Sequence, residues 1–356
     1  MNTLKKLAAL FLIYVGMSSS AYCLENVFYV LRTNASSKIS TMQDSVNSIQ
    51  KNASRIHMII SQAYQVDQTG KVWGFVDPAV QQFADSKHIK FIAMITNVGF
   101  NTQKAHLFLS NPKAQAKAIQ TLLDECDKHH YAGVQFDFEM IALEDRDELT
   151  RFYQTAADAL HKKGLIVSYA VAPLLGGANQ DSEFQRRLYK VWQGAYDLKA
   201  LGKSADFVTI MTYNQHAEGT TPGSTAGIRW VEAAIKYALT QMPAHKISLG
   251  IPAYSNYWYA GATSPTSRFT THMSDMSYKK VTEILKKHHA HLKWDPVNKV
   301  DYAIFERDWL NEYLFVENAK SFKAKLALAK KYHLRGISVF YIGIEDPGIW
   351  KVLHQK

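Results

Sequence analysis

The sequence predicts an α/β protein of the (β/α)8 TIM-barrel class, and three observations carry this prediction. Short β-rich segments recur eight times along the 356 residues. Stretches with helical spacing lie between them, so strand and helix alternate through nearly the whole chain. The composition, 47% hydrophobic and 20% charged, is typical of a globular protein. Eight such units favour a closed barrel over an open sheet.

The predicted elements follow one another in a regular order. Helices are expected at Pro112–His129, Asp145–Lys163 and Gly227–Gln241, each between two predicted strands. The eight predicted strands are Asn26–Leu31, Ile56–Ile60, Ile89–Thr96, Gly133–Phe138, Leu165–Val171, Phe207–Tyr213, Lys246–Ile251 and Gly336–Tyr341.

The last crossover, from Ile251 to Gly336, is much longer than one helix requires. It holds a helical pattern near Tyr278–His288 between aromatic, β-rich stretches. We therefore predict a small α+β insertion between the seventh and eighth strands, at about residues 254–315. The alternative is a long loop with no role of its own.

The first 23 residues have the pattern of a secretory signal peptide. Lys5 and Lys6 precede the apolar run Leu7–Val15, and small residues follow. The run is too short to favour a spanning helix, and no later stretch approaches the roughly 20 apolar residues that a bilayer crossing needs. We expect residues 1–23 to be removed and residues 24–356 to form a catalytic barrel. The product would be secreted, or held in the periplasm or cell envelope, without stable membrane insertion; an uncleaved anchor is the alternative.

The net charge and the residue types present limit which partners and cofactors can be expected. The net charge of +10 suits an anionic envelope polymer or surface. The lysines are scattered and no nucleic-acid-binding motif accompanies them, so no nucleic-acid partner is expected. Histidine-rich stretches lack a carboxylate or cysteine set at ligand spacing, and no phosphate-binding glycine loop appears. We expect a monomer that needs no metal and no cofactor.

The stretch YAGVQFDFEM, residues 131–140, is the strongest candidate for chemistry. Side chains alternate across a strand, so Gln135, Asp137 and Glu139 share one face. Active sites of TIM barrels form at the carboxyl ends of the strands, where Asp137 and Glu139 lie. Two neighbouring carboxylates in a partly desolvated site raise one pKa, which makes Glu139 a candidate proton donor and Asp137 its partner. A half-buried antiparallel strand would show the same alternation.

The placement of these carboxylates limits any glycosidase mechanism. Ordinary glycosidases flank the scissile bond with two carboxyl groups on opposite sides of the sugar. Two residues on one face of one strand approach from one side only. The nucleophile would then have to be the carbonyl oxygen of a 2-acetamido group on the substrate.

Further segments resemble glycoside hydrolase family 18, the chitinase-like family. GVQFDFE resembles its active-site signature Asp-Gly-x-Asp-x-Asp-x-Glu. The segments DFVTIMTYN, ISLGIPAYSNYW and RGISVFYIGIEDPGIW resemble its sixth, seventh and eighth strands, in the same order. Within the family, the chain is most similar to the bacterial spore cortex-lytic peptidoglycan N-acetylglucosaminidases, over most of residues 27–350.

The resemblance implies roles for individual residues. Glu139 would be the general acid, Asp137 the carboxylate that orients the acetamide, and Tyr213 a hydroxyl donor to the acetamide carbonyl. The remaining expected substrate-binding residues are Gln135, Met211, Asn214, Tyr254, Trp258 and Phe340. Among them Tyr254 and Trp258 are candidate stacking platforms for sugar rings, although aromatic residues also fill insertions.

Two positions depart from the family pattern. Ala132 stands where chitinases carry the first aspartate of the signature, and Phe340 stands where the eighth strand often supplies a tryptophan.

Taken as a whole, the resemblance implies an exported retaining glycosidase that cleaves β-linkages after N-acetylglucosamine in peptidoglycan or in chitin-type oligomers. A catalytically silent, lectin-like barrel that binds N-acetylated glycans is the alternative from another class. An endo-acting enzyme that releases N-glycans is a third reading with the same chemistry.

Overall fold

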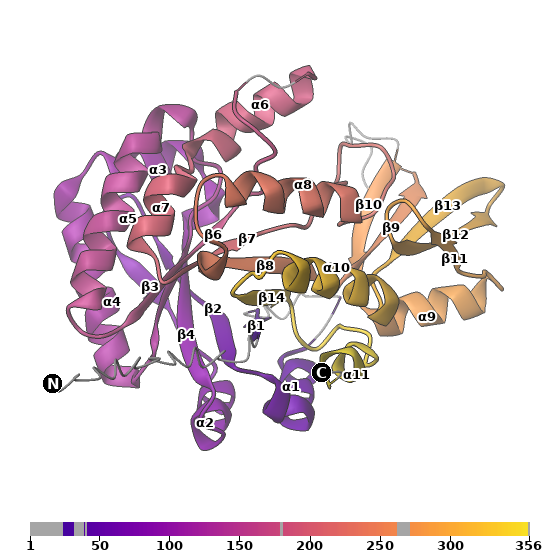
Figure 1. Cartoon of the computed structure of the whole chain (residues 1–356), viewed down its shortest axis with the longest axis horizontal. Helices are drawn as coiled ribbons and strands as arrows, with labels where there is room; N and C mark the ends of the chain where they lie inside the picture. Colours follow the sequence, from indigo (N-terminus) through magenta and orange to yellow (C-terminus); the bar gives the residue numbers. More distant parts are fainter. Residues whose placement is uncertain (1–23, 32–38, 40, 179–180, 262–270, 355–356) are drawn as a thin grey trace, which may run out of the picture.

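The computed structural model describes residues 24–31, 39, 41–178, 181–261 and 271–354, which form a closed barrel with a side sheet (Figure 1). Eight parallel strands make the barrel, and β1 closes it by pairing with both β14 and β2. These strands are β1 (Glu25–Val30), β2 (Met58–Val66), β4 (Lys90–Asn97), β5 (Gly133–Asp137), β6 (Ile166–Val171), β7 (Phe207–Ile210), β8 (Ile247–Pro252) and β14 (Gly336–Phe340). The TIM-barrel prediction is confirmed. The predicted signal peptide, residues 1–23, lies outside the described residues.

Helices cover the outside of the barrel (Figure 1). Local signals set their ends. The side chain of Asn111 accepts the N–H of Ala114 and Pro112 occupies the first turn of α4, which ends where His130 takes a left-handed backbone. The helices are α1 (Met42–Asn52), α2 (Pro78–Ser86), α3 (Thr102–Leu109), α4 (Pro112–His129), α5 (Arg146–His161), α6 (Glu183–Val191), α7 (Leu198–Ser204), α8 (Ile228–Leu239), α10 (Ala319–Lys331) and α11 (Ile349–His354). None of the described helices is long and apolar enough to span a membrane.

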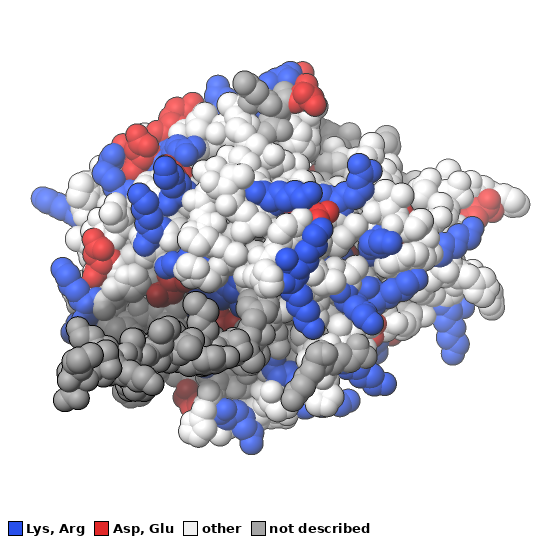
Figure 2. All heavy atoms as spheres, in the orientation of Figure 1, with Lys and Arg blue, Asp and Glu red and all other residues white. Residues whose placement is uncertain are grey.

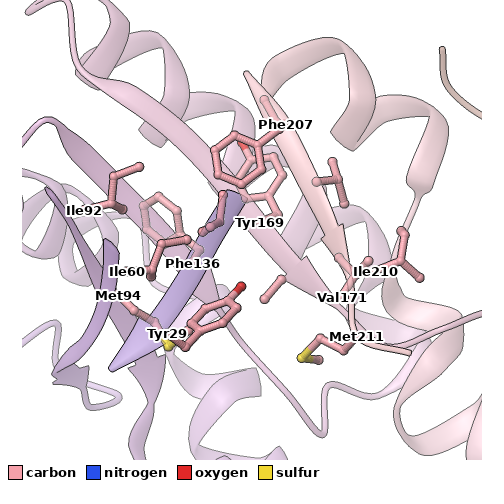
Figure 3. Packing of buried hydrophobic residues seen from close by; sticks show 14 of the residues in the cluster. Tyr29, Ile60, Ile92, Met94, Phe136, Tyr169, Val171, Phe207, Ile210 and Met211 are labelled. Atoms are coloured by element: carbon pink, nitrogen blue, oxygen red, sulfur yellow. The ribbon is translucent and has the colours of Figure 1, made fainter. Parts of the chain in front are cut away.

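The residues of β5 alternate between the two sides of the barrel wall. Phe136 packs against Tyr153 of α5, with ring centroids 5.4 Å apart. Gln135 points into the barrel, where it accepts a hydrogen bond from the Tyr29 hydroxyl at 2.8 Å and donates one to Ser168 at 3.1 Å. Figure 3 shows Tyr29 and Phe136 within this packing. Asp137, two residues beyond Gln135, therefore shares the inward face.

One predicted strand ends earlier than expected. The sixth barrel strand, β7, ends at Ile210, because the N–H groups of Thr212 and Tyr213 donate to the carbonyl oxygens of Ile210 and Met211, each at 2.8 Å. The N–H of Met211 still donates to Val171 of β6 at 2.9 Å, and the tight turns take residues 212–213 out of the sheet just beyond the carboxyl end of β7.

The long last crossover is a folded insertion with its own sheet. Its elements are β9 (Ser255–Ala260), β10 (Thr271–Met276), α9 (Tyr278–Lys287), β11 (Lys293–Asp295), β12 (Val300–Arg307) and β13 (Leu310–Val316). The strands are antiparallel in the order β10-β9-β13-β12-β11. A small buried cluster joins α9 to this sheet through residues such as Val281 and Leu314. The predicted α+β insertion is therefore confirmed against the loop alternative. A further short strand, β3 (Val72–Gly74), pairs antiparallel with β2.

Candidate active site

Two carboxyl groups lie at the carboxyl end of β5. Asp137 is the last residue of the strand and is 6% exposed, whereas Glu139 is half-buried. Burial raises the pKa of Glu139 to about 7, and the side chain of Trp192 partly opposes that shift. Burial, and then the charge of Glu139, raise the pKa of Asp137 well above its ordinary value. This pair can therefore hold a proton close to neutral pH.

The backbone that carries Glu139 is fixed by three side chains from elsewhere in the chain. The amide of Asn97, at the end of β4, accepts the N–H of Glu139 and donates to its carbonyl oxygen, both at 2.9 Å. The hydroxyl of Tyr196 donates to the carbonyl oxygen of Phe138 at 2.7 Å. The hydroxyl of Thr102 donates to the carbonyl oxygen of Met140 at 2.8 Å, where φ is 55°. Three consecutive residues after β5 are thus held in one geometry.

Aromatic side chains from three other strand ends form one wall beside this pair. The ring of Tyr213 stacks on Phe340 with centroids 5.0 Å apart and planes at 13°. Tyr254 meets both rings edge-on, at 6.4 Å. The hydroxyl of Tyr254 donates to the side-chain oxygen of Asn214, which is exposed. Burial, followed by the charges of neighbouring groups that include Asp137, raises the pKa of Tyr213 well above its ordinary value, so its hydroxyl keeps its proton.

Four of the expected substrate-binding residues are buried, and one of them is Tyr254 of the aromatic wall, which is 2% exposed. Gln135 is fully buried, and its side chain bonds to Tyr29 and Ser168. Met211 is 6% exposed and belongs to the main core (Figure 3). Trp258 is fully buried, and its indole N–H donates to the carbonyl oxygen of Gly223 at 3.0 Å. This placement does not fit the expected stacking platform, because the strand alternation of β9 turns Trp258 onto the loop between β7 and α8.

One oxygen of Asp137 lacks a donor. Its Oδ1 atom is buried and has no hydrogen-bond partner among the residues that the structure describes. A buried carboxylate oxygen without a donor carries a desolvation cost of about 1–3 kcal/mol or more. An N–H group of a bound ligand would remove that cost.

Sequence reasoning missed the residues around Glu139 that lie outside the segment resembling the family signature. Asn97, Thr102 and Tyr196 bond to residues 138–140 and come from two stretches, residues 97–102 and 192–196. Trp192, in the second stretch, lowers the pKa of Glu139. Asn97 follows directly on a predicted strand, which was the one signal that could have placed it at the barrel mouth. Among the described residues no group of three or more His, Cys, Asp or Glu side chains could hold a metal ion.

Two neighbouring carboxyl groups beside an aromatic wall at the mouth of a TIM barrel are typical of barrel-type glycoside hydrolases. The model of one family, the glycosyl hydrolases family 18, matches residues 6–344, and the chain belongs to this family.

Relatives similar to this chain include glycosylases of Bacillus. The chain is 27% identical to the uncharacterized glycosylase YvbX of Bacillus subtilis over 318 residues, covering 87% of this chain and 88% of that protein. It is 27% identical to the cortical fragment-lytic enzyme of the same organism, covering 78% of this chain but only 62% of that enzyme. The crystal structure of the Bacillus cereus spore cortex-lytic enzyme SleL superposes with a TM-score of 0.81, covering 93% of this chain and 73% of that one. At 23% identity, that last likeness concerns the fold alone.

Proposed function

We propose that this protein is an exported retaining glycosidase that cleaves β-linkages after N-acetylglucosamine by substrate-assisted catalysis. The observation that carries the proposal is the unpartnered Oδ1 atom of Asp137, buried next to a carboxyl group whose pKa is about 7. An acetamide N–H supplies the missing donor. The same acetamide supplies the nucleophile that a one-sided carboxyl pair lacks.

Each residue then has one task in the first step. Glu139 gives its proton to the glycosidic oxygen, and the bond between that oxygen and the anomeric carbon breaks. The acetamide carbonyl oxygen attacks the anomeric carbon from the opposite side and forms an oxazolinium ion. Asp137 accepts the acetamide N–H, which strengthens the carbonyl as a nucleophile and balances the new positive charge. The hydroxyl of Tyr213 donates to the carbonyl oxygen and keeps it in line.

The second step reverses these roles. Water attacks the anomeric carbon while the Glu139 carboxylate accepts a proton from it. The oxazolinium opens to the acetamide, and the anomeric configuration is retained after two inversions. Glu139 is protonated again, so the site is ready for another turnover.

Peptidoglycan is the substrate class that the similarities favour. Two relatives are named for lysis of spore cortex or its fragments. The positive charge of the chain is suited to a polymer that carries carboxylates. Export, inferred from the first 23 residues, would bring the enzyme to such a polymer. Chitin-type oligomers fit the same chemistry.

The test compares substrates that differ only in the acetyl group. Purified enzyme is incubated with fully N-acetylated glucosamine oligomers, with their de-N-acetylated counterparts and with peptidoglycan, and products are identified by mass. Hydrolysis that requires the acetyl group supports the proposal. Equal cleavage of deacetylated oligomers would refute substrate assistance, and binding of acetylated oligomers without any product would favour the lectin alternative.

A further inference from the structure

The outer sides of three helices form a surface that is nearly free of acidic residues. Glu232 of α8 and Glu283 of α9 are the two acidic residues in these helices, and α10 has none. Figure 2 shows basic side chains spread over the region that α8, α9 and α10 occupy in Figure 1. The exposed basic residues of these helices, which we call the basic face, are Arg229, Lys236, Lys279, Lys280, Lys286, Lys287, Lys320, Lys323, Lys330 and Lys331.

Most of these charges are not neutralised within the protein. Glu232 pairs with Lys331 at 2.7 Å, and Glu283 pairs with Lys280 at 3.2 Å. Lys320 lies 3.9 Å from a carboxylate oxygen of Asp301. The other seven residues of the basic face form no ion pair within the described part of the chain. Holding like charges together is unfavourable, and an external polyanion would relieve the repulsion.

The three helices are also fixed relative to the barrel. Lys331 and Tyr332, at the end of α10, both donate to the same oxygen of Glu232 on α8 at 2.7 Å. The N–H of Tyr278, at the start of α9, donates to the carbonyl oxygen of Ile344 at 2.9 Å. The backbone from which the residues of the basic face project is therefore held in place.

The residue types of the basic face indicate which kind of partner it can bind. Nine of its ten residues are lysines, which act as strongly hydrated point charges rather than as bidentate forks. None of the exposed large apolar side chains of the described residues lies on these three helices. A surface without such side chains has no large exposed apolar group to insert into a bilayer. It fits a flexible polymer that carries separated carboxylates.

We propose that the basic face binds the carboxylate groups of an acidic glycan polymer, such as the stem peptides of peptidoglycan, outside the catalytic cleft. The inference rests on the proposed function, because it assigns to this face the polymer that the cleft cuts. Many weak contacts would keep the enzyme on an insoluble substrate between cleavage events. Such contacts weaken with salt, since surface charges are screened within about 10 Å at 0.1 M.

The experiment measures retention on insoluble peptidoglycan by co-sedimentation, in a Glu139→Gln background so that the polymer is not consumed. One variant carries Lys286→Gln, Lys287→Gln, Lys323→Gln and Lys330→Gln. Its matched control carries Lys90→Gln, Lys113→Gln, Lys162→Gln and Lys163→Gln, four exposed lysines elsewhere on the chain. We expect about tenfold weaker retention for the first variant at low salt, little change for the control, and release of the parent at about 0.5 M salt. Peptidoglycan whose carboxyl groups have been amidated should retain the parent no better than it retains the first variant.

Other results would overturn the inference. Equal losses in both quadruple variants would mean that net charge alone is responsible. Undiminished retention on the amidated polymer would mean that carboxylates are not recognised, and tighter retention on vesicles of anionic phospholipid would point to a membrane instead. Hydrolysis of a neutral N-acetylglucosamine oligomer, measured with Glu139 intact, should be the same in both variants. If that hydrolysis is absent from the wild-type enzyme while retention follows the expected pattern, the proposed function fails and the basic face stands.

Discussion

The side chain of Asn97 exchanges two hydrogen bonds with the backbone of Glu139, both 2.9 Å long. Asn97 is 4% exposed and ends the strand next to the one that carries the carboxyl pair. An amide is the side-chain group that can donate and accept in this reciprocal way. The position of the candidate acid is therefore set by a neighbouring strand as well as by its own.

Asn97→Ala should lower kcat more than it lowers stability. The substitution leaves the N–H and the carbonyl oxygen of Glu139 without these partners, and a displacement of about 1 Å at a catalytic group can cost about 10²-fold in rate. We expect a fall in kcat of about ten- to a hundredfold, with a small change in KM, measured on an N-acetylated oligomer.

Asn101→Ala is the matched control for Asn97→Ala. Asn101 accepts the N–H of Lys104 as the N-cap of α3, so its loss should cost about 1 kcal/mol of stability. Because it bonds no part of residues 138–140 in the structure, kcat should stay close to that of the wild type. Equal kcat values for the two variants would show that the Asn97 bonds do not position the acid.

Tyr213→Phe tests the hydroxyl donor separately from the aromatic wall. The phenyl ring can keep its stacking on Phe340, while the donor to the acetamide carbonyl is lost. Removal of one such donor costs about 10²–10³ in kcat in other enzymes that stabilise a developing charge. Tyr254→Phe removes a hydroxyl that donates to Asn214 and should have a smaller effect. A Tyr213→Phe enzyme with normal kcat would remove Tyr213 from the mechanism.

Local sequence patterns were enough to predict the fold and to place Asp137 and Glu139 at the carboxyl end of β5. Period-two alternation placed Gln135 and Asp137 on one face, and eight strand–helix units predicted the barrel, because both depend on short-range rules. The supports of Glu139 could not be predicted in this way. Asn97 and Tyr196 meet its segment only after distant parts of the chain have packed.

Trp258 is a residue that sequence reasoning placed in the site although its surroundings could not be predicted. In the sequence it stands with Tyr254 in one aromatic cluster, and nothing local distinguishes the two side chains. The structure buries both, Tyr254 against Tyr213 and Phe340 and Trp258 against the loop between β7 and α8, because the pairing of β9 with β10 and β13 fixes which side of the insertion sheet faces that loop. Sheet pairing is a long-range property, so the burial of Trp258 could not be read from its neighbours.

A buried ion pair predicts an unusual stability response in α10. The ammonium group of Lys325 lies 3.0 and 2.8 Å from the two carboxylate oxygens of Glu317, and both side chains are at most 3% exposed. Lys325→Met leaves a buried carboxylate without its cation, which should lower the free energy of unfolding by about 3–5 kcal/mol. Lys323→Met, on the exposed side of the same helix, should change it by less than about 0.5 kcal/mol. Denaturant unfolding that shows equal effects at both positions would contradict this.

The pH dependence of hydrolysis should report the pKa of Glu139. Only its acid form can protonate the leaving oxygen, and burial raises its pKa to about 7, so kcat/KM should fall as the pH rises above about 7. The side chain of Trp192 lowers this pKa. Trp192→Phe should therefore move the alkaline limb to higher pH, whereas Trp294→Phe, in the insertion, should leave it in place. A limb that moves to lower pH in the Trp192 variant would have the wrong sign for this electrostatic interaction.

The same titration makes stability depend on pH in a direction that can be stated in advance. A carboxyl group whose pKa rises from 4.5 in the unfolded chain to about 7 in the folded one binds more protons when folded. The unfolding free energy therefore carries its full favourable contribution below pH 4.5 and loses it as the pH rises toward 7. Glu139→Gln cannot titrate, so its melting temperature relative to the wild type should rise between these two values and then level off. The charge of Glu139 also raises the pKa of Asp137, so the substitution weakens that shift too and adds to the difference in the same direction. A difference that is constant with pH, or that falls, would show that Glu139 is not held in its acid form by burial.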